Sequence, residues 1–225
     1  MNIDFHAHFL PKADHGSDSV ETSLRQLALA QEAEIDVLAA TPHFYPKQDN
    51  AEAFLERRKA CYAELCQQWT GKKPILRLGA EVHLCRGLEH LPELRQLCLR
   101  GTNLLLLELP GDFRMSTYLS TLEALLYDCK IRPILAHVDR YSADIIGSLF
   151  HMGFLGQLNA SSLCRFFGRK QRLRWIEEGH IVALGSDLHG IKTGYTEFLQ
   201  VRKQFPRHYA TIMERCGALL YEGAK

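Results

Sequence analysis

Short apolar segments of strand type alternate with longer segments of helical periodicity, and this alternation constrains the fold more than any other feature of the chain. Parallel strands need long crossover connections, which are usually helices, so the pattern indicates an α/β fold. The expected strands are apolar on both faces, which also indicates an α/β fold, because helices cover both faces of a parallel sheet. The expected strands lie near residues 2–6, 36–41, 75–82, 103–109, 132–138, 154–160 and 181–187.

The segments between these strands carry apolar residues at spacings of three and four, which is the pattern of a helix with one buried face. Seven parallel strands buried on both faces are expected to close into a barrel, with an open doubly wound sheet as the alternative. In a barrel, the functional residues lie at the carboxyl ends of the strands. We predict helices at 19–34, 50–69, 88–100, 116–130, 142–152 and 163–179, and closing helices at 194–205 and 206–220.

The size and charge of the chain limit what it can be. No repeat, low-complexity stretch or flexible linker divides the 225 residues, so we expect a single domain over residues 1–225. The 27 Lys+Arg residues nearly balance the 26 Asp+Glu residues, which gives no support for a nucleic acid or an anionic membrane as the main partner. The amino-terminal residues do not resemble a signal peptide, and no apolar run approaches the roughly 20 residues that span a bilayer. Seven cysteines without a C-x-x-C pair suit reduced thiols, so we expect a cytoplasmic protein.

Side chains that can bind metal follow almost every expected strand. Two of them, in His6-Ala7-His8, have the spacing that places both imidazoles on one side of a strand. Alone, this pair would be interpreted as two ordinary hydrogen-bonded histidines, but the same kind of residue recurs at the other strand ends. The candidates are His6, His8, His43, Glu81, Glu108, His137, Asp187 and His189.

The chemistry of these candidates indicates a cluster of divalent ions. Imidazole mixed with carboxylate, without thiolate, suits manganese, zinc or iron better than calcium or a structural zinc site. These eight candidates exceed what one ion takes at roughly three to four protein ligands, so two or three ions are expected. Clustered divalent ions favour phosphoryl transfer, because they bind phosphate oxygens and acidify a water molecule.

Ordered motifs over nearly the whole chain resemble the polymerase-and-histidinol-phosphatase (PHP) superfamily. These motifs are Ile3-Asp4-Phe5-His6-Ala7-His8, Ala40-Thr41-Pro42-His43, Gly79-Ala80-Glu81, Leu135-Ala136-His137 and Gly185-Ser186-Asp187-Leu188-His189. A narrower resemblance is to the manganese-dependent protein-tyrosine phosphatases of bacterial capsule and exopolysaccharide operons. It is carried by Phe9-Leu10-Pro11, Glu108-Leu109-Pro110, His137-Val138-Asp139-Arg140-Tyr141 and residues 157–163.

This resemblance implies a distorted seven-stranded TIM-like barrel with three metal positions. The first would take His6, His8, Glu81 and Asp187; the second would share Glu81 and add Glu108 and His137; the third would use His15, His43 and His189. Glu81 would then bridge two ions. The related phosphatases usually carry an aspartate at the position of His15, and Asp14 is the alternative ligand.

The resemblance also implies a phosphate-binding arginine, which here is Arg140, with Arg140, Glu81 and His137 as the catalytic residues. A planar guanidinium suits two-point contact with phosphate oxygens. Two departures bear on the substrate: Val138-Asp139 replaces the more usual Pro-Glu, and only Lys192 stands where the family tends to supply a further arginine. We expect Lys192 to contribute to substrate binding as a point charge.

We therefore expect a metal-dependent phosphomonoesterase, in which a hydroxide that bridges the metal ions attacks phosphorus without a covalent enzyme intermediate. The expected substrate is phosphotyrosine on a bacterial tyrosine kinase of polysaccharide assembly and export, and the expected ions are two to three manganese ions, with zinc or iron as alternatives. A small-molecule phosphatase, such as a histidinol-phosphatase, is one alternative function. A non-catalytic regulatory metal-binding domain is another, and an amidohydrolase is a third that fits the carboxylates and the strand count less well. We expect neither nucleic acid binding nor membrane insertion, and an oligomer is compatible with the sequence.

Overall fold

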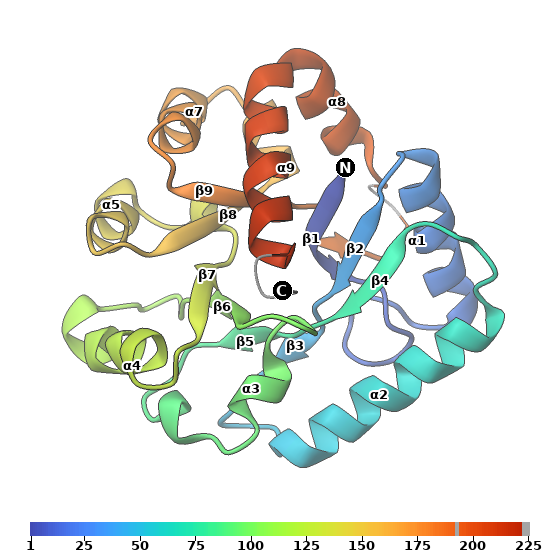
Figure 1. Ribbon diagram of the computed structural model, residues 1–225, viewed down its shortest axis with the longest axis horizontal. Coiled ribbons are helices and arrows are strands. Elements are labelled where there is room, and N and C mark those ends of the chain that lie inside the picture. Colours follow the sequence, from blue (N-terminus) through green and yellow to red (C-terminus); the bar gives the residue numbers. More distant parts are fainter. Residues whose placement is uncertain (192–193, 222–225) are drawn as a thin grey trace.

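The computed structural model describes residues 1–191 and 194–221. Parallel strands lie at the centre, and most of the helices lie around them (Figure 1). No helix in the described part of the chain is long and apolar enough to cross a membrane. The strands are β1 (Ile3–His8), β2 (Val37–Ala40), β3 (His43–Phe44), β4 (Ile75–Leu78), β5 (Glu81–His83), β6 (Leu104–Glu108), β7 (Arg132–Leu135), β8 (Leu155–Asn159), β9 (Ile181–Gly185) and β10 (Leu188–His189).

The prediction of parallel α/β architecture is confirmed, but that of one seven-stranded barrel is not. All strand pairs are parallel, and they form a four-stranded sheet in the order β10-β1-β2-β4 and a six-stranded sheet in the order β3-β5-β6-β7-β8-β9. β1 packs against β9, yet no strand pairing joins the two sheets among the described residues.

The difference between the seven expected and the ten observed strands comes from short interruptions. The segments that begin as β2, β4 and β9 each continue in a second, shorter strand that belongs to the other sheet. The first interruption contains Pro42, which lacks the N–H that a strand ladder needs, and the third contains Asp187, whose φ of 53° leaves the strand conformation. The second interruption is Gly79-Ala80. Each interruption therefore passes the chain from one sheet to the other, next to a candidate metal ligand.

The helices agree with the sequence patterns except in two segments. The predicted helix at 88–100 is replaced by η1 and the short α3, because Pro92 interrupts it. The predicted helix at 163–179 divides into α6 and α7 at Gly168, where φ is 72°. The helices are α1 (Val20–Glu32), α2 (Ala51–Gln68), η1 (Leu88–His90), α3 (Leu94–Leu97), α4 (Met115–Tyr127), η2 (Val138–Arg140), α5 (Ala143–His151), α6 (Ala160–Cys164), α7 (Arg169–Glu177), α8 (Thr196–Gln204) and α9 (Pro206–Tyr221).

The apolar core lies between the strands and the surrounding helices. β2, most of β6 and all of β9 are buried, as the apolar runs in the sequence predicted. The carboxy-terminal helix α9 packs against β1 and β9, which brings the two ends of the described chain together (Figure 1). This rigid centre leaves the carboxyl ends of the strands as the place where polar side chains gather.

Candidate metal centre

Four of the predicted ligands converge on one small volume, at the end of β1, at the start of β5 and directly after β9. His6 and His8 lie two residues apart on β1, so both imidazoles point to the same side, and both are buried. Their Nε2 atoms are 2.9 Å apart. Glu81 Oε2 lies 3.1 Å from His6 Nε2 and 3.3 Å from His8 Nε2, and Asp187 Oδ1 lies 3.6 Å from each of the two nitrogens.

These distances fit the donor set of one divalent cation. Ligand atoms that each lie about 2.1 Å from one ion are separated by roughly 3 to 3.5 Å from one another. The other nitrogen of each ring is already occupied: His6 Nδ1 lies 3.1 Å from Gln157 Oε1, and His8 Nδ1 lies 2.6 Å from Asp14 Oδ2. Because oxygen can only accept there, each Nδ1 carries the hydrogen, and Nε2 is the nitrogen that faces the cluster.

A second group extends from the other oxygen of Glu81. His137 Nε2 lies 2.8 Å from Glu81 Oε1 and 3.6 Å from Glu108 Oε1. The two oxygens of Glu81 thus face different histidines, as a bridging carboxylate would. Glu108, at the end of β6, is only partly buried and also lies 3.2 Å from Nδ1 of His83.

The third group is formed by three stacked imidazoles on the more open side of the cluster. The ring centroid of His15 lies 4.8 Å from that of His43 and 4.7 Å from that of His189. Ligand atoms of His8, His43 and His189 lie within 4.8 Å of one another, so His8 stands between the first and third groups. Asp14 instead accepts hydrogen bonds from His8 Nδ1 and from the backbone N–H of His43. Asp14 therefore orients His8 and His43, while the ring of His15 stacks on those of His43 and His189.

Buried polar atoms in this cluster lack acceptable hydrogen bonds to the described residues. Glu81 Oε2 and His43 Nδ1 are 2.9 Å apart, yet neither has a hydrogen bond of acceptable geometry. His137 Nδ1 and His189 Nε2 are also without one. Since buried polar groups are nearly always satisfied, such a concentration of them fits a site that holds a cation.

The charges of the cluster stabilise one another. Burial alone would raise the pKa of the Glu81 carboxyl, but the charge of His6 and the hydrogen bond from His137 hold that pKa well below its ordinary value. Burial opposes the charged form of His8, but the adjacent carboxylates of Asp14 and Glu81 outweigh it and raise the pKa of His8 to about 10. Without metal, protons therefore occupy positions that a cation would take.

The local backbone explains how these side chains reach one point. His137 (φ 31°) and Asp187 (φ 53°) adopt left-handed conformations where their strands end, which is uncommon for residues other than glycine and costs energy. Gly185 allows a close approach, because a Cβ there would lie 2.5 Å from Gln157 Nε2 and 2.6 Å from His6 Cβ. The cluster therefore depends on backbone strain at His137 and Asp187 and on the absence of a side chain at Gly185.

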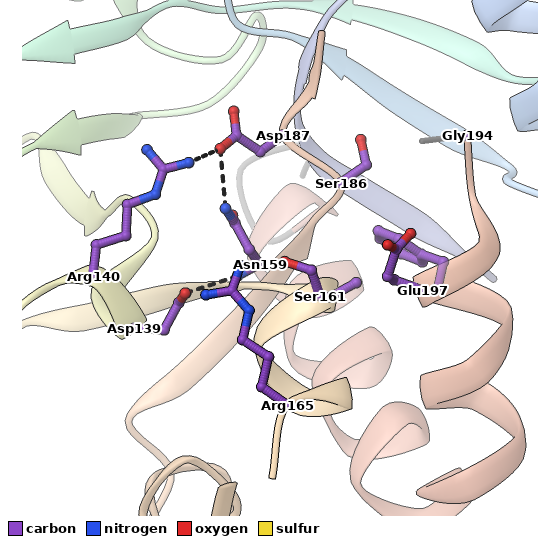
Figure 2. A pocket seen from close by; sticks show the side chains of 11 residues that line it. Asp139, Arg140, Asn159, Ser161, Arg165, Ser186, Asp187, Gly194 and Glu197 are labelled. Carbon is purple, nitrogen blue, oxygen red and sulfur yellow. Dashed lines mark hydrogen bonds and ion pairs between the residues drawn. The ribbon is translucent and has the colours of Figure 1, made fainter. Parts of the chain in front are cut away.

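Arg140 lies at the edge of the cluster, beside a cavity of about 200 Å³ that Asp187 also lines (Figure 2). The Arg140 guanidinium donates to Asp187 Oδ2, and the Nδ2 group of Asn159 donates to the same oxygen at 3.0 Å. Asp187 therefore turns Oδ1 to the histidines and Oδ2 to these two donors. The predicted substrate-binding residue Lys192 lies outside the described residues.

Comparisons with known proteins identify the family of the chain. The family model for capsular polysaccharide synthesis, CpsB/CapC, matches residues 2–221. The chain belongs to the CpsB/CapC family. A protein from Staphylococcus aureus described as putative tyrosine-protein phosphatase CapC is 29% identical over 202 residues, which is 84% of this chain and 77% of that protein.

A solved structure resembles this CpsB/CapC chain over almost its full length. It comes from crystal structures of YwqE from Bacillus subtilis and CpsB from Streptococcus pneumoniae, described as unique metal-dependent tyrosine phosphatases. The TM-score is 0.77 at 25% sequence identity, and the match covers 97% of this chain and 94% of that chain.

Several residues of the site in this CpsB/CapC chain were not among the predicted ligands. His83 Nδ1 contacts Glu108 Oε2. Gln157 accepts from the backbone N–H of His137 at 2.7 Å and from His6, so it ties two groups together. Asp4 is fully buried and accepts from Ser186 Oγ at 2.6 Å and Tyr195 Oη at 2.8 Å. The one signal in the sequence was that each of Asp4 and Gln157 is a polar residue inside an apolar strand segment.

Proposed function

We propose that this CpsB/CapC chain is a metal-dependent protein-tyrosine phosphatase. The observation that carries the proposal is the position of Glu81, whose Oε2 lies 3.1 and 3.3 Å from the histidines of β1 and whose Oε1 lies 2.8 Å from His137. A carboxylate that bridges two cation positions is typical of sites that hold clustered divalent ions for phosphoryl transfer. The descriptions of the two relatives, a tyrosine-protein phosphatase and metal-dependent tyrosine phosphatases, support the same function.

We assign the residues of the cluster to three cation positions, as expected from the sequence. His6, His8, Glu81 and Asp187 would hold the first ion, Glu81, Glu108 and His137 the second, and His15, His43 and His189 the third. When bound, such ions supply positive charge to the phosphate oxygens and acidify a water molecule. Manganese is our expected metal, with zinc or iron as alternatives, because the donors are imidazoles and carboxylates.

The role of Arg140 is to bind and orient the phosphate. A guanidinium has five N–H donors, so its contact with Asp187 does not exhaust it. Its side chain is 52% exposed beside the cavity, where a phosphate can reach it. Glu81 and His137 complete the proposed catalytic residues through the cations that they would hold. We keep Lys192 as a further substrate-binding residue.

The proposed substrate is a phosphotyrosine-bearing protein, and we favour a bacterial tyrosine kinase of polysaccharide assembly. The family description, capsular polysaccharide synthesis, supports this choice. The seven cysteines, all within the described residues, are free thiols, which supports a cytoplasmic site of action. We also propose that residues 1–225 form one domain, since the predicted cation ligands come from both ends of the chain.

The test is hydrolysis by the purified protein of an aryl phosphate, a phosphotyrosyl peptide, a phosphoseryl peptide and histidinol phosphate, with and without Mn²⁺. We expect turnover of the aryl phosphate and the phosphotyrosyl peptide, complete loss after chelation, and recovery on adding metal. Glu81→Gln should lower kcat/KM at least about a hundredfold and reduce the metal content, because it removes a bridging charge. Glu52→Gln, on the exposed surface of α2, is the matched control.

Two outcomes would contradict the proposal. One is full activity of the chelated protein, and the other is a preference for histidinol phosphate over the phosphotyrosyl peptide at saturating metal.

A further inference from the structure

Two adjacent phenylalanines stand out from the surface between α6 and α7. Phe166 is 80% exposed and Phe167 is 87% exposed, which makes them the most exposed of the large hydrophobic residues in the described chain. Their rings contact each other edge to face, with centroids 5.8 Å apart. Exposure of two neighbouring aromatic side chains is unfavourable in water, so a contact with a partner is the usual reason for it.

Hydrogen bonds from two arginine side chains hold the loop that carries these phenylalanines. Arg169 donates to the carbonyl oxygen of Cys164 at 2.6 Å, and Arg172 donates to the carbonyl oxygen of Phe167. Gly168 adopts a φ of 72°, and a Cβ there would lie 2.7 Å from Arg172 Nη1. The loop is therefore fixed by partly buried guanidinium contacts, and it presents the aromatic rings on a preformed support.

The same loop contributes one residue to the lining of the cavity at the metal centre. Arg165, directly before Phe166, lines the cavity that Arg140 and Asp187 also line, and Figure 2 shows it on the wall formed by α6. A substrate whose phosphate lies beside Arg140 and Asp187 would therefore extend past Arg165. Residues next to the phosphotyrosine in an extended peptide advance about 3.3 Å each, so the first few of them reach the rim of the cavity.

The charge around the phenylalanines selects the kind of peptide. Residues 165–174 contain no acidic residue and carry Arg165, Arg169, Lys170, Arg172 and Arg174, although the whole chain has a net charge of only +1. Of these, only Arg165 lines the cavity, while Arg174 pairs with Glu178 and Arg172 is buried. Arg165 therefore adds positive charge to that of Arg140 at the cavity, which attracts a phosphorylated segment.

We propose that three residues, Arg165, Phe166 and Phe167, bind the peptide residues that flank the phosphotyrosine. These three residues are here called the aromatic loop. The partner is an extended phosphotyrosine segment with a large apolar or aromatic side chain within a few residues of the phosphate. The phenylalanines supply an apolar platform for that side chain, and Arg165 supplies charge at the cavity rim. This inference rests on the proposed function and specifies how the same site recognises its substrate.

The experiment compares the wild-type protein with the double variant Phe166→Ser/Phe167→Ser on three substrates at saturating Mn²⁺. These are p-nitrophenyl phosphate, a phosphotyrosyl peptide with leucine and tyrosine neighbours, and the same peptide with glycine and serine neighbours. We measure the ratio of kcat/KM for each peptide to kcat/KM for p-nitrophenyl phosphate. For the apolar peptide we expect the ratio to fall about tenfold, mainly through KM, because two anchoring side chains are lost. For the glycine-serine peptide the ratio should change less than about twofold.

Tyr127→Ser is the matched control, since Tyr127 is 60% exposed at the end of α4 and does not line the cavity. It should leave both ratios at the wild-type value. Both variants remove exposed aromatic surface, so circular dichroism melts should show that the fold is retained.

Other occupants of the aromatic loop give different results. One such result is that the double variant loses binding to vesicles of phosphatidylglycerol and phosphatidylcholine while the kcat/KM ratios stay unchanged. This result would overturn the proposal in favour of a membrane surface. A change in sedimentation coefficient with unchanged ratios would overturn it in favour of a second copy of the chain. If the wild-type protein hydrolyses all three substrates and no ratio moves, this inference fails and the proposed function stands. If the wild-type protein hydrolyses none of them, both fail.

Discussion

Single atoms determine how the cluster can hold cations. Each of His6 and His8 has Nδ1 engaged by an oxygen acceptor, which directs Nε2 to the cluster. Glu81 divides its two oxygens between two histidine groups, and Asp187 divides its own between the histidines and the donors Arg140 and Asn159. Replacement of one side chain would therefore disturb more than one contact.

The pKa of His8 predicts that metal binding releases protons. With a pKa of about 10 in the metal-free protein, His8 carries its proton at neutral pH, and a cation that takes Nε2 must displace it. The apparent affinity for Mn²⁺ should therefore rise about tenfold per pH unit for each displaced proton below that pKa, and level off above it. Calorimetric titrations from pH 6.5 to 8.5, in buffers of different ionisation enthalpy, measure the number of protons released. An affinity that does not change over this range would contradict the prediction.

Two polar residues on one side of strand β8 support the cluster. Gln157 and Asn159 point to the same side of β8, and Gln157 Nε2 donates to Asn159 Oδ1 at 2.9 Å. Gln157 contacts the first and second groups, while Asn159 holds Asp187. β8 therefore acts as a brace whose polar residues fix the orientation of ligands on other strands.

Asn159→Leu tests the brace, because it keeps the branched shape of the side chain and removes the hydrogen bond to Asp187. We expect the affinity for Mn²⁺ to fall about ten- to a hundredfold, as for other residues that orient ligands. A competition assay with a fluorescent chelator gives the dissociation constant. Asn103→Leu is the control. Asn103, directly before β6, is exposed and donates a hydrogen bond to the carbonyl oxygen of Lys130. Equal dissociation constants for the two variants would show that β8 does not support the site.

The interruptions of the strands show what local sequence could predict. Apolar runs located every one of the seven strand regions, because burial on both faces leaves a clear pattern. They did not predict that three of these regions would pass from one sheet to the other, since hydrogen-bond partners are chosen between distant segments. The helical spacing of apolar residues also predicted continuous helices at 88–100 and 163–179. In the structure, these helices are interrupted at Pro92 and Gly168.

At the scale of the whole molecule, cations should contribute to the stability of the fold. The proposed ligands come from segments between His6 and His189, so a bound ion cross-links nearly the entire chain. A ligand that binds only the folded state adds about 2.7 kcal/mol at a concentration a hundred times its dissociation constant. For a chain of this size, this corresponds to a rise in Tm of roughly 5 to 10 °C.

Thermal melts followed by circular dichroism, with chelator and with increasing Mn²⁺, measure this effect. The rise in Tm should be largely lost in His6→Ala, which lacks a ligand of the first group. A Tm that is the same with chelator and with saturating Mn²⁺ would mean that no cation joins these segments.

The sequence alone determined the α/β class, the approximate places of the strands, and the residue types that gather at their ends. These follow from local properties: apolar periodicity along the chain and polar side chains directly after it. Tertiary structure alone decided that the strands divide into two sheets, that Asp14 orients His8, and that Gln157 and Asp4 support the cluster. It also placed Phe166 and Phe167 in solvent beside the cavity. These features depend on contacts between residues far apart in the chain, and no local pattern encodes which distant partner a polar or apolar side chain will meet.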